Sequence, residues 1–428
     1  MAELGDVSQA AMARVRRRLI PFLFLLYVVA YLDRVNVGFA ALDMNRDLGF
    51  SAAVYGLGSG IFFVSYTLLE VPSNLMLARV GAGLWIARIM LTWGLVSAAM
   101  AFVQDATTFY VLRFLLGAAE AGFFPGIIYY LTQWFPARER ARAVALFMTG
   151  TAIAGVIGGP LSSVLLLLDG TWGLRGWQWL FVVEGLPAVL LAPVVWRQLN
   201  QLPATATWLP EDERRWLVET LAAEQRSRPD LHGTMRAAFA SGRLWALAAI
   251  YFSVVLAIYG VSFWLPQILQ GLGTASSATV ALISAIPYVA AAVAMVLIGA
   301  HSDRTRERRR HVALSALAGA AGFALAALVP ASLTLSLAAL SLAAMGVWGT
   351  LGPFWALPTA FLTGRGAAGG VALVNSVANI GGFIGPTLMG YMRDLTGTFA
   401  AGLWLLTVAL ATGAVIALLL PAGQGDSR

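Results

Sequence analysis

The sequence predicts an all-α integral membrane protein with twelve transmembrane helices arranged in two six-helix bundles. Of its 428 residues, 59% are hydrophobic and only 11% are charged, which lies outside the range of water-soluble globular chains. Apolar runs of about twenty residues, the length needed to cross a bilayer, recur along the chain. One long polar interval, residues 197–243, separates the sixth run from the seventh and divides the chain into two halves.

Each apolar run is bounded by polar or charged residues. The predicted spans are Leu19–Ala41, Val54–Leu77, Leu84–Val103, Thr107–Thr132, Arg142–Leu168, Gly176–Trp196, Leu244–Leu269, Ala278–Ala300, His311–Val329, Leu333–Leu362, Ala367–Met392 and Phe399–Leu420. The first six form one predicted bundle, 19–197, and the last six form the other, 244–420. We expect an N-terminal tail (1–18), a central loop (198–243) and a C-terminal tail (421–428) outside the membrane.

Arginine accounts for all 28 basic residues, and its distribution predicts the orientation. If the N-terminus is cytoplasmic, the outside loops hold only Arg46, Arg175 and Arg393, whereas the inside segments hold most of the others. This bias predicts that both termini are cytoplasmic. The net charge of +7 therefore reflects membrane topology and not a nucleic-acid partner. Because residues 1–18 lack an apolar run with a cleavage site, we expect a retained tail and no signal peptide.

The central loop contains one segment with a helical pattern. Leu209–Glu224 has a proline and acids at its start, with Trp216, Leu217 and Leu221 available as an apolar face. This pattern predicts a short amphipathic helix on the membrane surface.

Side chains suited to enzyme or metal chemistry are scarce. The chain has no cysteine, which excludes thiolate metal sites and cysteine nucleophiles, and its three histidines fall in polar or basic stretches. We therefore expect no enzymatic activity, no cofactor and no metal. The expected surroundings are the lipid bilayer, and we expect a monomer.

Four charged residues inside the spans indicate a functional site. Asp33 and Arg34 are adjacent in the first span, and Arg113 and Glu120 lie two turns apart on one face of the fourth. A charge at the centre of a membrane costs roughly 2.5 to 3.5 kcal/mol on insertion scales, so such residues usually have a function. If the two spans face each other, Arg113 can pair with Asp33, and Arg34 and Glu120 lie closer to the centre.

The two acids and two arginines cancel formally, which makes the cluster bearable in a low dielectric. We expect Asp33 and Glu120 to bind and release protons as water access and partners change. A static neutral network that joins the two helices is the alternative.

Two further acids lie within spans. We expect Glu70 to form a structural salt bridge near Arg79 and Arg88. Glu184 precedes a Gly-Leu-Pro kink, and we expect it to serve packing or an interspan hydrogen bond.

The second half is built differently, because its first and fourth spans contain no ionisable residue. They offer polar and aromatic side chains that include Tyr259, Trp264 and Trp355, and the eleventh span offers Asn375 and Asn379, one turn apart on one face. These groups could hold a small polar or aromatic ligand. An interfacial aromatic belt for the tryptophans and interhelical hydrogen bonding for the asparagines remain alternatives.

Glycine and proline interrupt corresponding spans of the two halves. The fifth span and the eleventh each carry a cluster, comprising Gly150, Gly155, Gly158, Gly159 and Pro160 in one and Gly381, Gly382, Gly385 and Pro386 in the other. Paired interruptions of this kind are typical of transporters built from structural repeats that rock around a central site.

Several motifs resemble the anion:cation symporter family of the major facilitator superfamily, especially its bacterial permeases for tartrate, phthalate, hydroxyphenylacetate and sugar acids. The stretches are YLDRVNVGFA, EVPSNLMLARVGAGLWIARI, RFLLGAAEAGFFPGIIYYLTQWFP and NSVANIGGFIGP. The loop after span eight, GAHSDRTRERRR, is similar to the superfamily's loop motif through Gly299, Asp303 and Arg304. After span two, Arg79 and Gly81 are kept, whereas Asn74 and Ala78 stand where glycine and aspartate are usual, a departure typical of one branch.

The resemblance implies the major facilitator fold and proton-coupled uptake of a small organic carboxylate by alternating access across a bacterial inner membrane. By position, Asp33 and Glu120 match the family's proton-coupling acids, Arg113 their partner, and Arg34 the carboxylate-binding arginine. Trp355 and Asn375 fall where sugar-acid members contact substrate hydroxyls.

Tyr31, Tyr259 and Asn379 complete the predicted binding site.

Two other functions stay open. One is a proton-coupled efflux antiporter, although Arg34 in the cavity disfavours cationic ligands. The other is a transport-derived sensor.

Overall fold

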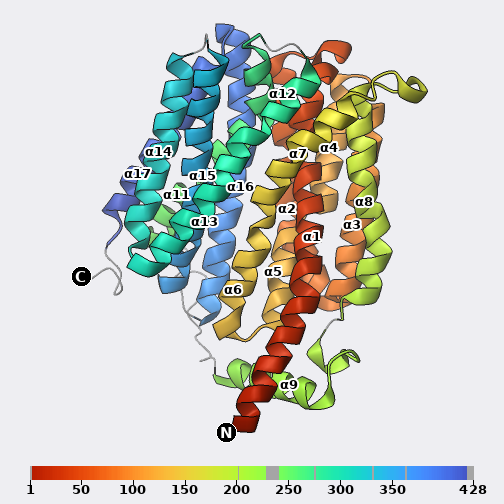
Figure 1. Ribbon diagram of the computed structural model, residues 1–428, viewed down its shortest axis with the longest axis vertical. Helices are drawn as coiled ribbons and strands as arrows, with labels where there is room; N and C mark the ends of the chain where they lie inside the picture. The colour runs from red at the N-terminus through yellow and green to blue at the C-terminus, as the bar shows by residue number, and fades with distance from the viewer. Residues whose placement is uncertain are drawn as a thin grey trace.

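The computed structural model describes residues 2–200, 202–227, 241–273, 276–329, 332–361 and 364–421. Within these ranges, twelve helical segments are long and apolar enough to cross a membrane, and they stand side by side in one bundle of helices (Figure 1). The predicted all-helical, twelve-span fold is confirmed.

The N-terminal half contains the first six spans. Its helices are α1 (Ala2–Leu48), α2 (Ala52–Val80), α3 (Ala82–Ala99), α4 (Ala106–Glu120), α5 (Phe123–Trp134), α6 (Ala137–Met148), α7 (Gly150–Leu166) and α8 (Gly176–Gln198), with short 3-10 turns at η1 (Met100–Phe102), η2 (Thr171–Gly173) and η3 (Pro203–Thr205). The fourth span consists of α4 followed by α5, and the fifth contains α7, which continues from α6.

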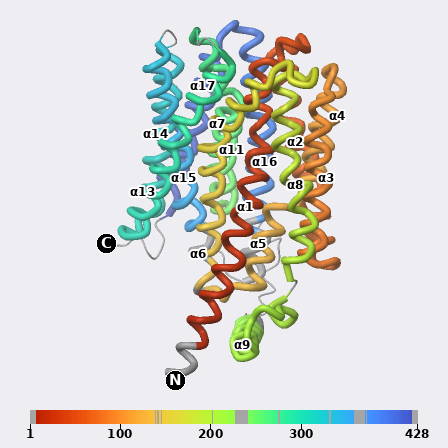
Figure 2. Tube along the Cα trace, turned by 45° about the vertical axis from the view of Figure 1, so that its right-hand side comes forward, coloured from red at the N-terminus to blue at the C-terminus, as the bar shows by residue number. Residues whose placement is uncertain are grey.

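The C-terminal half contains the other six spans. Its helices are α11 (Gly242–Gln270), α12 (Ser277–Ile283), α13 (Ala285–Thr305), α14 (Arg308–Leu328), α15 (Leu333–Phe361), α16 (Gly364–Thr396) and α17 (Ala400–Leu419). The eighth span runs through α12 and α13. The tube in Figure 2 shows this half beside the N-terminal half. Helices α1 and α7 of the first half and α11 of the second lie where the two halves meet.

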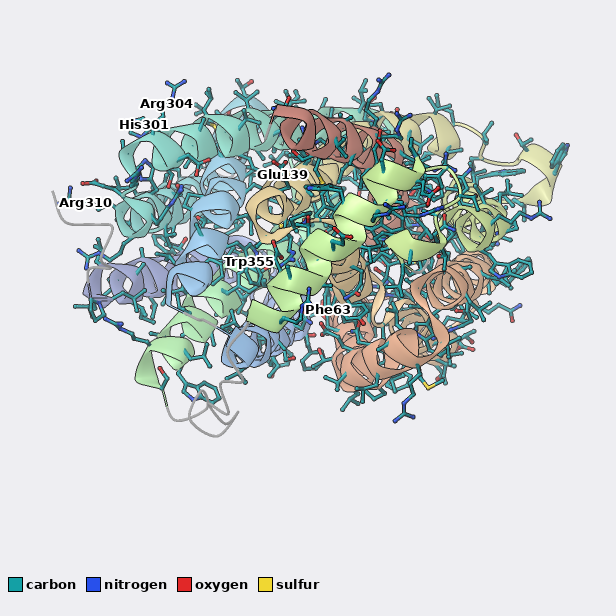
Figure 3. All side chains as sticks on the ribbon, turned by 90° about the horizontal axis from the view of Figure 1, so that it is seen from below. Phe63, Glu139, His301, Arg304, Arg310 and Trp355 are labelled. Carbon is teal, nitrogen blue, oxygen red and sulfur yellow. The ribbon has the colours of Figure 1, made fainter. Side chains whose placement is uncertain are left out.

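Helix α9 (Glu211–Ser227) lies across one end of the bundle, close to the N-terminal part of α1 (Figures 1 and 3). It covers most of the predicted amphipathic segment. Arg14 of α1 donates two hydrogen bonds to Glu213 of α9, at 3.0 and 3.1 Å. Helix α1 begins at Ala2, well before the predicted span, because its arginine-rich first part continues the same helix and bonds to α9.

Ion pairs and hydrogen bonds at this α9 end join parts of the N-terminal half to one another. Arg16 bonds to Glu139 at 2.8 Å, and the Glu224 carboxylate accepts from the backbone N–H of Ala137 at 2.8 Å, at the start of α6. The polar contacts of α9 therefore fasten it to the first bundle.

At the opposite end, marked by α12 in Figure 1, hydrogen bonds join the two halves. Asp394 of α16 accepts from the first two N–H groups of α2, at 3.0 and 2.8 Å. The hydroxyl of Tyr55 donates to the carbonyl oxygen of Phe263 on α11 at 2.8 Å.

Glycine allows the close approach at this end. A Cβ atom on Gly56 would lie 2.6 Å from the carbonyl oxygen of Pro386 on α16, closer than real Cβ atoms approach an oxygen. Small residues let helix backbones pack closely, so the two bundles meet here through their backbones.

Candidate functional site

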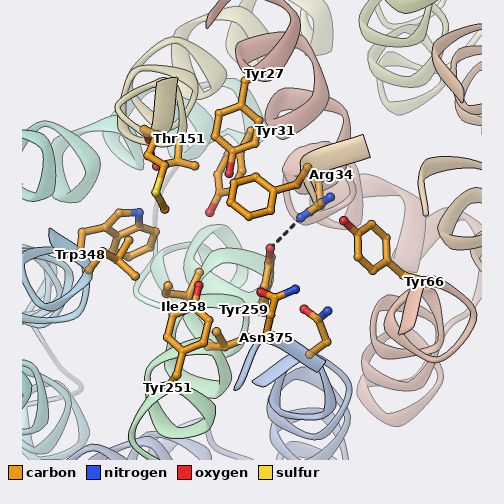
Figure 4. A pocket seen from close by; sticks show the side chains of 15 residues that line it. Tyr27, Tyr31, Arg34, Tyr66, Thr151, Tyr251, Ile258, Tyr259, Trp348 and Asn375 are labelled. Atoms are coloured by element: carbon orange, nitrogen blue, oxygen red, sulfur yellow. Dashed lines mark hydrogen bonds between the residues drawn. The ribbon is translucent and has the colours of Figure 1, made fainter. Parts of the chain in front are cut away.

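A cavity of about 70 Å³ lies between the two halves. Both halves contribute to its wall, which is mainly aromatic with a few polar groups (Figure 4). Its lining residues are Tyr27, Tyr31, Arg34, Tyr66, Phe124, Met148, Thr151, Tyr251, Val255, Ile258, Tyr259, Trp348, Leu351, Asn375 and Asn379. A cavity at the junction of two bundles, with few convergent polar groups, is a typical small-molecule site.

Arg34 is the charged group of this cavity. Its guanidinium forms an ion pair with the carboxylate of Glu120, and its Nη1 donates to the hydroxyl of Tyr259 at 3.0 Å (Figure 4). The side chains of Arg34 and Glu120 are only 11% and 2% exposed. Tyr66 also lies near the guanidinium, whose central carbon is 5.2 Å from the centre of the ring. The arginine is therefore held by one carboxylate, one hydroxyl and aromatic surface.

Glu120 occupies the last position of α4, where the fourth span is interrupted. Ala121 leaves the helical conformation, with φ −53° and ψ 129°, and Gly122 follows with φ +87°. A Cβ on Gly122 would lie 2.7 Å from Cβ of Ser73 on α2, so both the backbone conformation and the space require glycine. The interruption ends one helix at the carboxylate that pairs with Arg34.

Asp33 is buried on another side of α1. Its carboxylate accepts hydrogen bonds from Trp93 Nε1 at 2.7 Å, Ser97 Oγ at 2.5 Å and Asn36 Nδ2 at 3.1 Å. The predicted pair of Asp33 with Arg113 is wrong. Adjacent residues of a helix point in directions about 100° apart, so Asp33 faces α3, whereas Arg34 faces the cavity.

Arg113 is fully buried and bonds to backbone. Its Nε and Nη2 donate to the carbonyl oxygens of Gly58 and Ser59 on α2, at 3.2 and 3.1 Å. The guanidinium carbon also lies 5.1 Å from the centre of the Phe62 ring. In the part of the chain that the structure describes, Arg113 forms no ion pair with an acid. It links α4 to the glycine-rich part of α2.

Glu70 does not form the predicted salt bridge with Arg79 or Arg88. Instead its carboxylate accepts from Asn375 Nδ2 at 2.9 Å and from Asn379 Nδ2 at 3.2 Å, both on α16. The helical face shared by the two asparagines, which the sequence predicted, therefore faces α2. This contact joins the two halves next to the cavity.

Of the three aromatic residues predicted in the second half, one lines the cavity and two lie away from it. Tyr259 lines the cavity as predicted, and Trp355 packs edge-on against Tyr251, with ring centres 4.9 Å apart. Tyr251 lines the cavity but Trp355 is not among the lining residues, so Trp355 supports a wall residue (Figure 3 marks its position). Trp264 is fully buried and donates to the carbonyl of Pro386 at 3.1 Å, which contradicts an interfacial position.

The remaining predicted residues lie outside the cavity. Glu184 accepts a 3.4 Å hydrogen bond from Ser162 on α7, in agreement with an interspan bond. Gly81 separates α2 from α3 with φ +100°. Asp303 pairs with Arg308 at 2.5 Å, and Arg304 is exposed at the α9 end (Figure 3).

Gly299 lies in α13 with open space where a Cβ would be, and Arg79 is exposed in the last turn of α2. Among the described residues, no three histidine, aspartate or glutamate side chains group as a metal site.

Most of the cavity wall escaped the sequence prediction. Tyr27, Tyr66, Thr151 and Tyr251 line it without having been identified. Tyrosines inside a span provide a signal, because a buried hydroxyl needs a polar partner. That signal cannot indicate which face of a helix borders a cavity.

The twelve spans, the two halves and the buried ion pair beside a central cavity define a membrane transporter. The chain belongs to the Major Facilitator Superfamily, whose family model matches residues 23–386. It is therefore a multi-pass membrane protein and a secondary transporter, not an enzyme.

Transporters from other bacteria are similar to this chain over most of its length. A putative tartrate transporter of Agrobacterium vitis is 49% identical over 416 residues, covering 97% of this chain and 92% of the relative. A quinolone resistance transporter of Acinetobacter baumannii is 42% identical and covers 96% of this chain and 95% of that protein.

The fold also matches the crystal structure of a bacterial homolog of the human lysosomal transporter Spinster, in an inward-facing and occupied conformation. The TM-score is 0.76 with 20% identity, over 94% of this chain and 96% of the other.

Proposed function

We propose that the protein takes up a small organic carboxylate together with protons, by alternating access, across the inner membrane of a bacterium. The observation that supports this most directly is the pairing of Arg34 with Glu120 at the wall of the central cavity. The planar guanidinium binds carboxylates through two parallel hydrogen bonds. The name of the Agrobacterium vitis relative, a putative tartrate transporter, supports a hydroxylated dicarboxylate as the substrate.

Coupling follows from competition for one guanidinium. While Glu120 is ionised, it occupies Arg34, and a substrate carboxylate must displace it. A proton on Glu120 removes the competing charge and leaves Arg34 free for the substrate. Proton binding and anion binding therefore favour each other, and by linkage the effect is reciprocal. Loss of the proton on the other side of the membrane returns Arg34 to Glu120 and releases the substrate.

Asp33 is the second proton-binding acid of this proposal. It lies one residue before Arg34 but in a separate environment made by Trp93 and Ser97 of α3. A change in its charge would alter how α1 packs on α3. We assign Arg113 the role of holding α4 against α2, through its bonds to the carbonyl oxygens of Gly58 and Ser59.

The access pathway follows from the orientation that the arginines predict. If the α9 end is cytoplasmic, the end near α12, where hydrogen bonds join the two halves, faces the periplasm, and in the proposed cycle this is the conformation closed to the periplasm. Alternating access would then break the contacts at the α12 end and form others near the loop-motif residues Arg79, Gly81, Gly299, Asp303 and Arg304. Both termini would lie in the cytoplasm, and one chain suffices for the cavity.

Uptake into proteoliposomes tests the proposal. With an alkaline interior, the wild-type protein should concentrate labelled tartrate, whereas Glu120→Gln should lose this accumulation and keep exchange of tartrate across the membrane at equal pH. Glu213→Gln is the matched control, because Glu213 is a buried acid that bonds to Arg14 at the α9 end and is not among the lining residues of the cavity, so it should be dispensable for coupling. Undiminished accumulation by Glu120→Gln would reject the coupling role.

Proton-coupled efflux is the second candidate, favoured by the quinolone resistance transporter among the relatives. A fluoroquinolone carries a carboxylate that Arg34 could bind. Everted membrane vesicles distinguish the two functions. Acidification inside such vesicles should drive a fluoroquinolone inward if the protein is an antiporter, and should not do so if it is a symporter.

A further inference from the structure

Glu70 is a buried acid that the coupling scheme does not use. It lies on α2 and is 7% exposed, and its two carboxylate oxygens accept from two different asparagines of α16. Asn375 and Asn379 line the cavity, whereas Glu70 is not among the lining residues. The carboxylate therefore stands behind two polar groups of the wall and contacts both.

This arrangement fixes the direction of both amides. An ionised carboxylate offers only acceptors, and an asparagine amide carries a donor nitrogen and an acceptor oxygen. Each asparagine must turn Nδ2 toward Glu70, so each Oδ1 points away from it. Among the residues that the structure describes, no donor bonds to either Oδ1. Figure 4 shows Asn375 beside Tyr259 at the edge of the cavity.

We infer that Glu70 is a positioning residue that sets substrate specificity, because it presents the amide oxygens of Asn375 and Asn379 as hydrogen-bond acceptors to the cavity. The inference rests on the proposed function and assigns recognition of the substrate's hydroxyl groups to named residues. A carboxylate that also carries hydroxyl groups can bond to Arg34 through its acid and to the amide oxygens through its hydroxyls. A carboxylate without hydroxyls covers the two amide oxygens and leaves them without a donor, which weakens its binding.

Tartrate and succinate are suitable probes, because they differ only in two hydroxyl groups. The purified protein is reconstituted, and the half-saturation concentration of each acid is measured by equal-pH exchange. The wild-type protein should favour tartrate by about tenfold or more, the value of one to two well-formed hydrogen bonds.

In Glu70→Gln the new amide can donate as well as accept, so Asn375 or Asn379 can reverse. The preference for tartrate should then fall to about threefold or less, mainly through weaker tartrate binding. Glu70→Asp keeps the charge but is one methylene shorter and cannot reach both amides, so its preference should fall in the same direction. It replaces Glu70→Gln if that variant does not fold. Glu184→Gln, with the same change in another buried acid, should keep the wild-type preference.

The outcomes separate this inference from the proposed function. An unchanged tartrate preference in folded Glu70 variants, with both acids affected equally, would show that Glu70 only joins α2 to α16 and would overturn the inference. If the wild-type protein exchanges both acids equally well, the inference also fails while carboxylate transport stands. If it exchanges neither acid, the proposed dicarboxylate substrate is rejected, and this inference with it.

Discussion

The two halves contribute opposite chemistry to one cavity. The N-terminal half supplies all of the charge, with Arg34 at the wall and Glu120 paired behind it. The C-terminal half supplies neutral groups, namely the hydroxyl of Tyr259, the amides of Asn375 and Asn379 and the aromatic rings around them. The two halves of the transporter, with six spans each, therefore differ in the chemistry that they bring to the cavity.

This difference suggests a division of function. A charged pair inside the membrane is tolerated only when both partners remain together, and placing both within one half keeps them together while the halves move. The neutral half can then approach and leave without breaking the ion pair of Arg34 with Glu120. In our proposal, proton coupling belongs to the first half and recognition of the rest of the substrate to the second.

The largest effect is expected from removing the charge on the wall itself. Arg34→Gln deletes the carboxylate-binding fork and leaves Glu120 buried without its partner, which costs about 3 to 5 kcal/mol in comparable pairs. We expect kcat/KM for tartrate uptake to fall by about 100-fold or more. Arg34→Lys keeps the charge but not the fork, so its loss should be smaller.

The double variant Arg34→Gln/Glu120→Gln separates folding from function. With both charges removed, thermal stability in detergent should recover relative to Arg34→Gln alone, whereas uptake should not. Tartrate uptake by Arg34→Gln within tenfold of wild type would contradict the assignment of charge recognition to the first half.

The second prediction concerns the surface on which the two halves meet. At Gly56 the N-terminal half approaches the backbone of α16 so closely that any larger side chain must push the halves apart. Gly56→Leu should therefore disfavour the conformation that is closed at the α12 end. If the orientation is as proposed, the cavity should open toward the periplasm in this variant. Gly242→Leu is the matched control, because open space surrounds Gly242 at the start of α11.

The absence of cysteine makes this shift measurable. A single cysteine introduced at Thr151, in the cavity wall, reports which side admits a membrane-impermeant maleimide. In the Gly242→Leu background, labelling should come mainly from the α9 side. In the Gly56→Leu background, labelling from the α12 side should increase. Equal patterns in the two backgrounds would show that the close approach at Gly56 does not control access.

The sequence was sufficient for the fold and for the identity of the charged residues. Every residue of a membrane span must tolerate hydrocarbon, so spans appear in the sequence as long apolar runs. For this reason the twelve spans could be predicted. Arg34 and Glu120 were identifiable because charge inside an apolar run is rare. The face that a helix turns to its neighbour is not encoded in this way, and for that reason the Asp33–Arg113 pair was predicted wrongly.

Partners from distant parts of the chain were also beyond sequence reasoning. Glu70 lies near Arg79 and Arg88 along the chain, which favoured a local salt bridge, but its partners are Asn375 and Asn379, about 300 residues away. Every residue has a backbone carbonyl oxygen, so the sequence does not indicate which of them accept hydrogen bonds. The bonds of Arg113 to Gly58 and Ser59 could not be predicted for this reason. The interruption after Glu120 is also invisible to the sequence alone, because a glycine at position 122 does not by itself indicate a left-handed residue there.

The smallest effect is expected at the hydrogen bond that joins Arg34 of the charged wall to Tyr259 of the neutral wall. Tyr259→Phe removes the hydroxyl that accepts from Arg34 at 3.0 Å but keeps the ring. Arg34 retains Glu120, so the loss should be about 0.5 to 1.5 kcal/mol, seen as a rise of roughly two- to tenfold in the KM for tartrate with kcat little changed. Tyr66→Phe is the control from the charged half, because among the described residues Arg34 donates a hydrogen bond to the hydroxyl of Tyr259 and none to that of Tyr66, and its KM should change less than in Tyr259→Phe. A larger effect at Tyr66 than at Tyr259 would show that the first half alone positions Arg34, and the division of function between the halves would have to be redrawn.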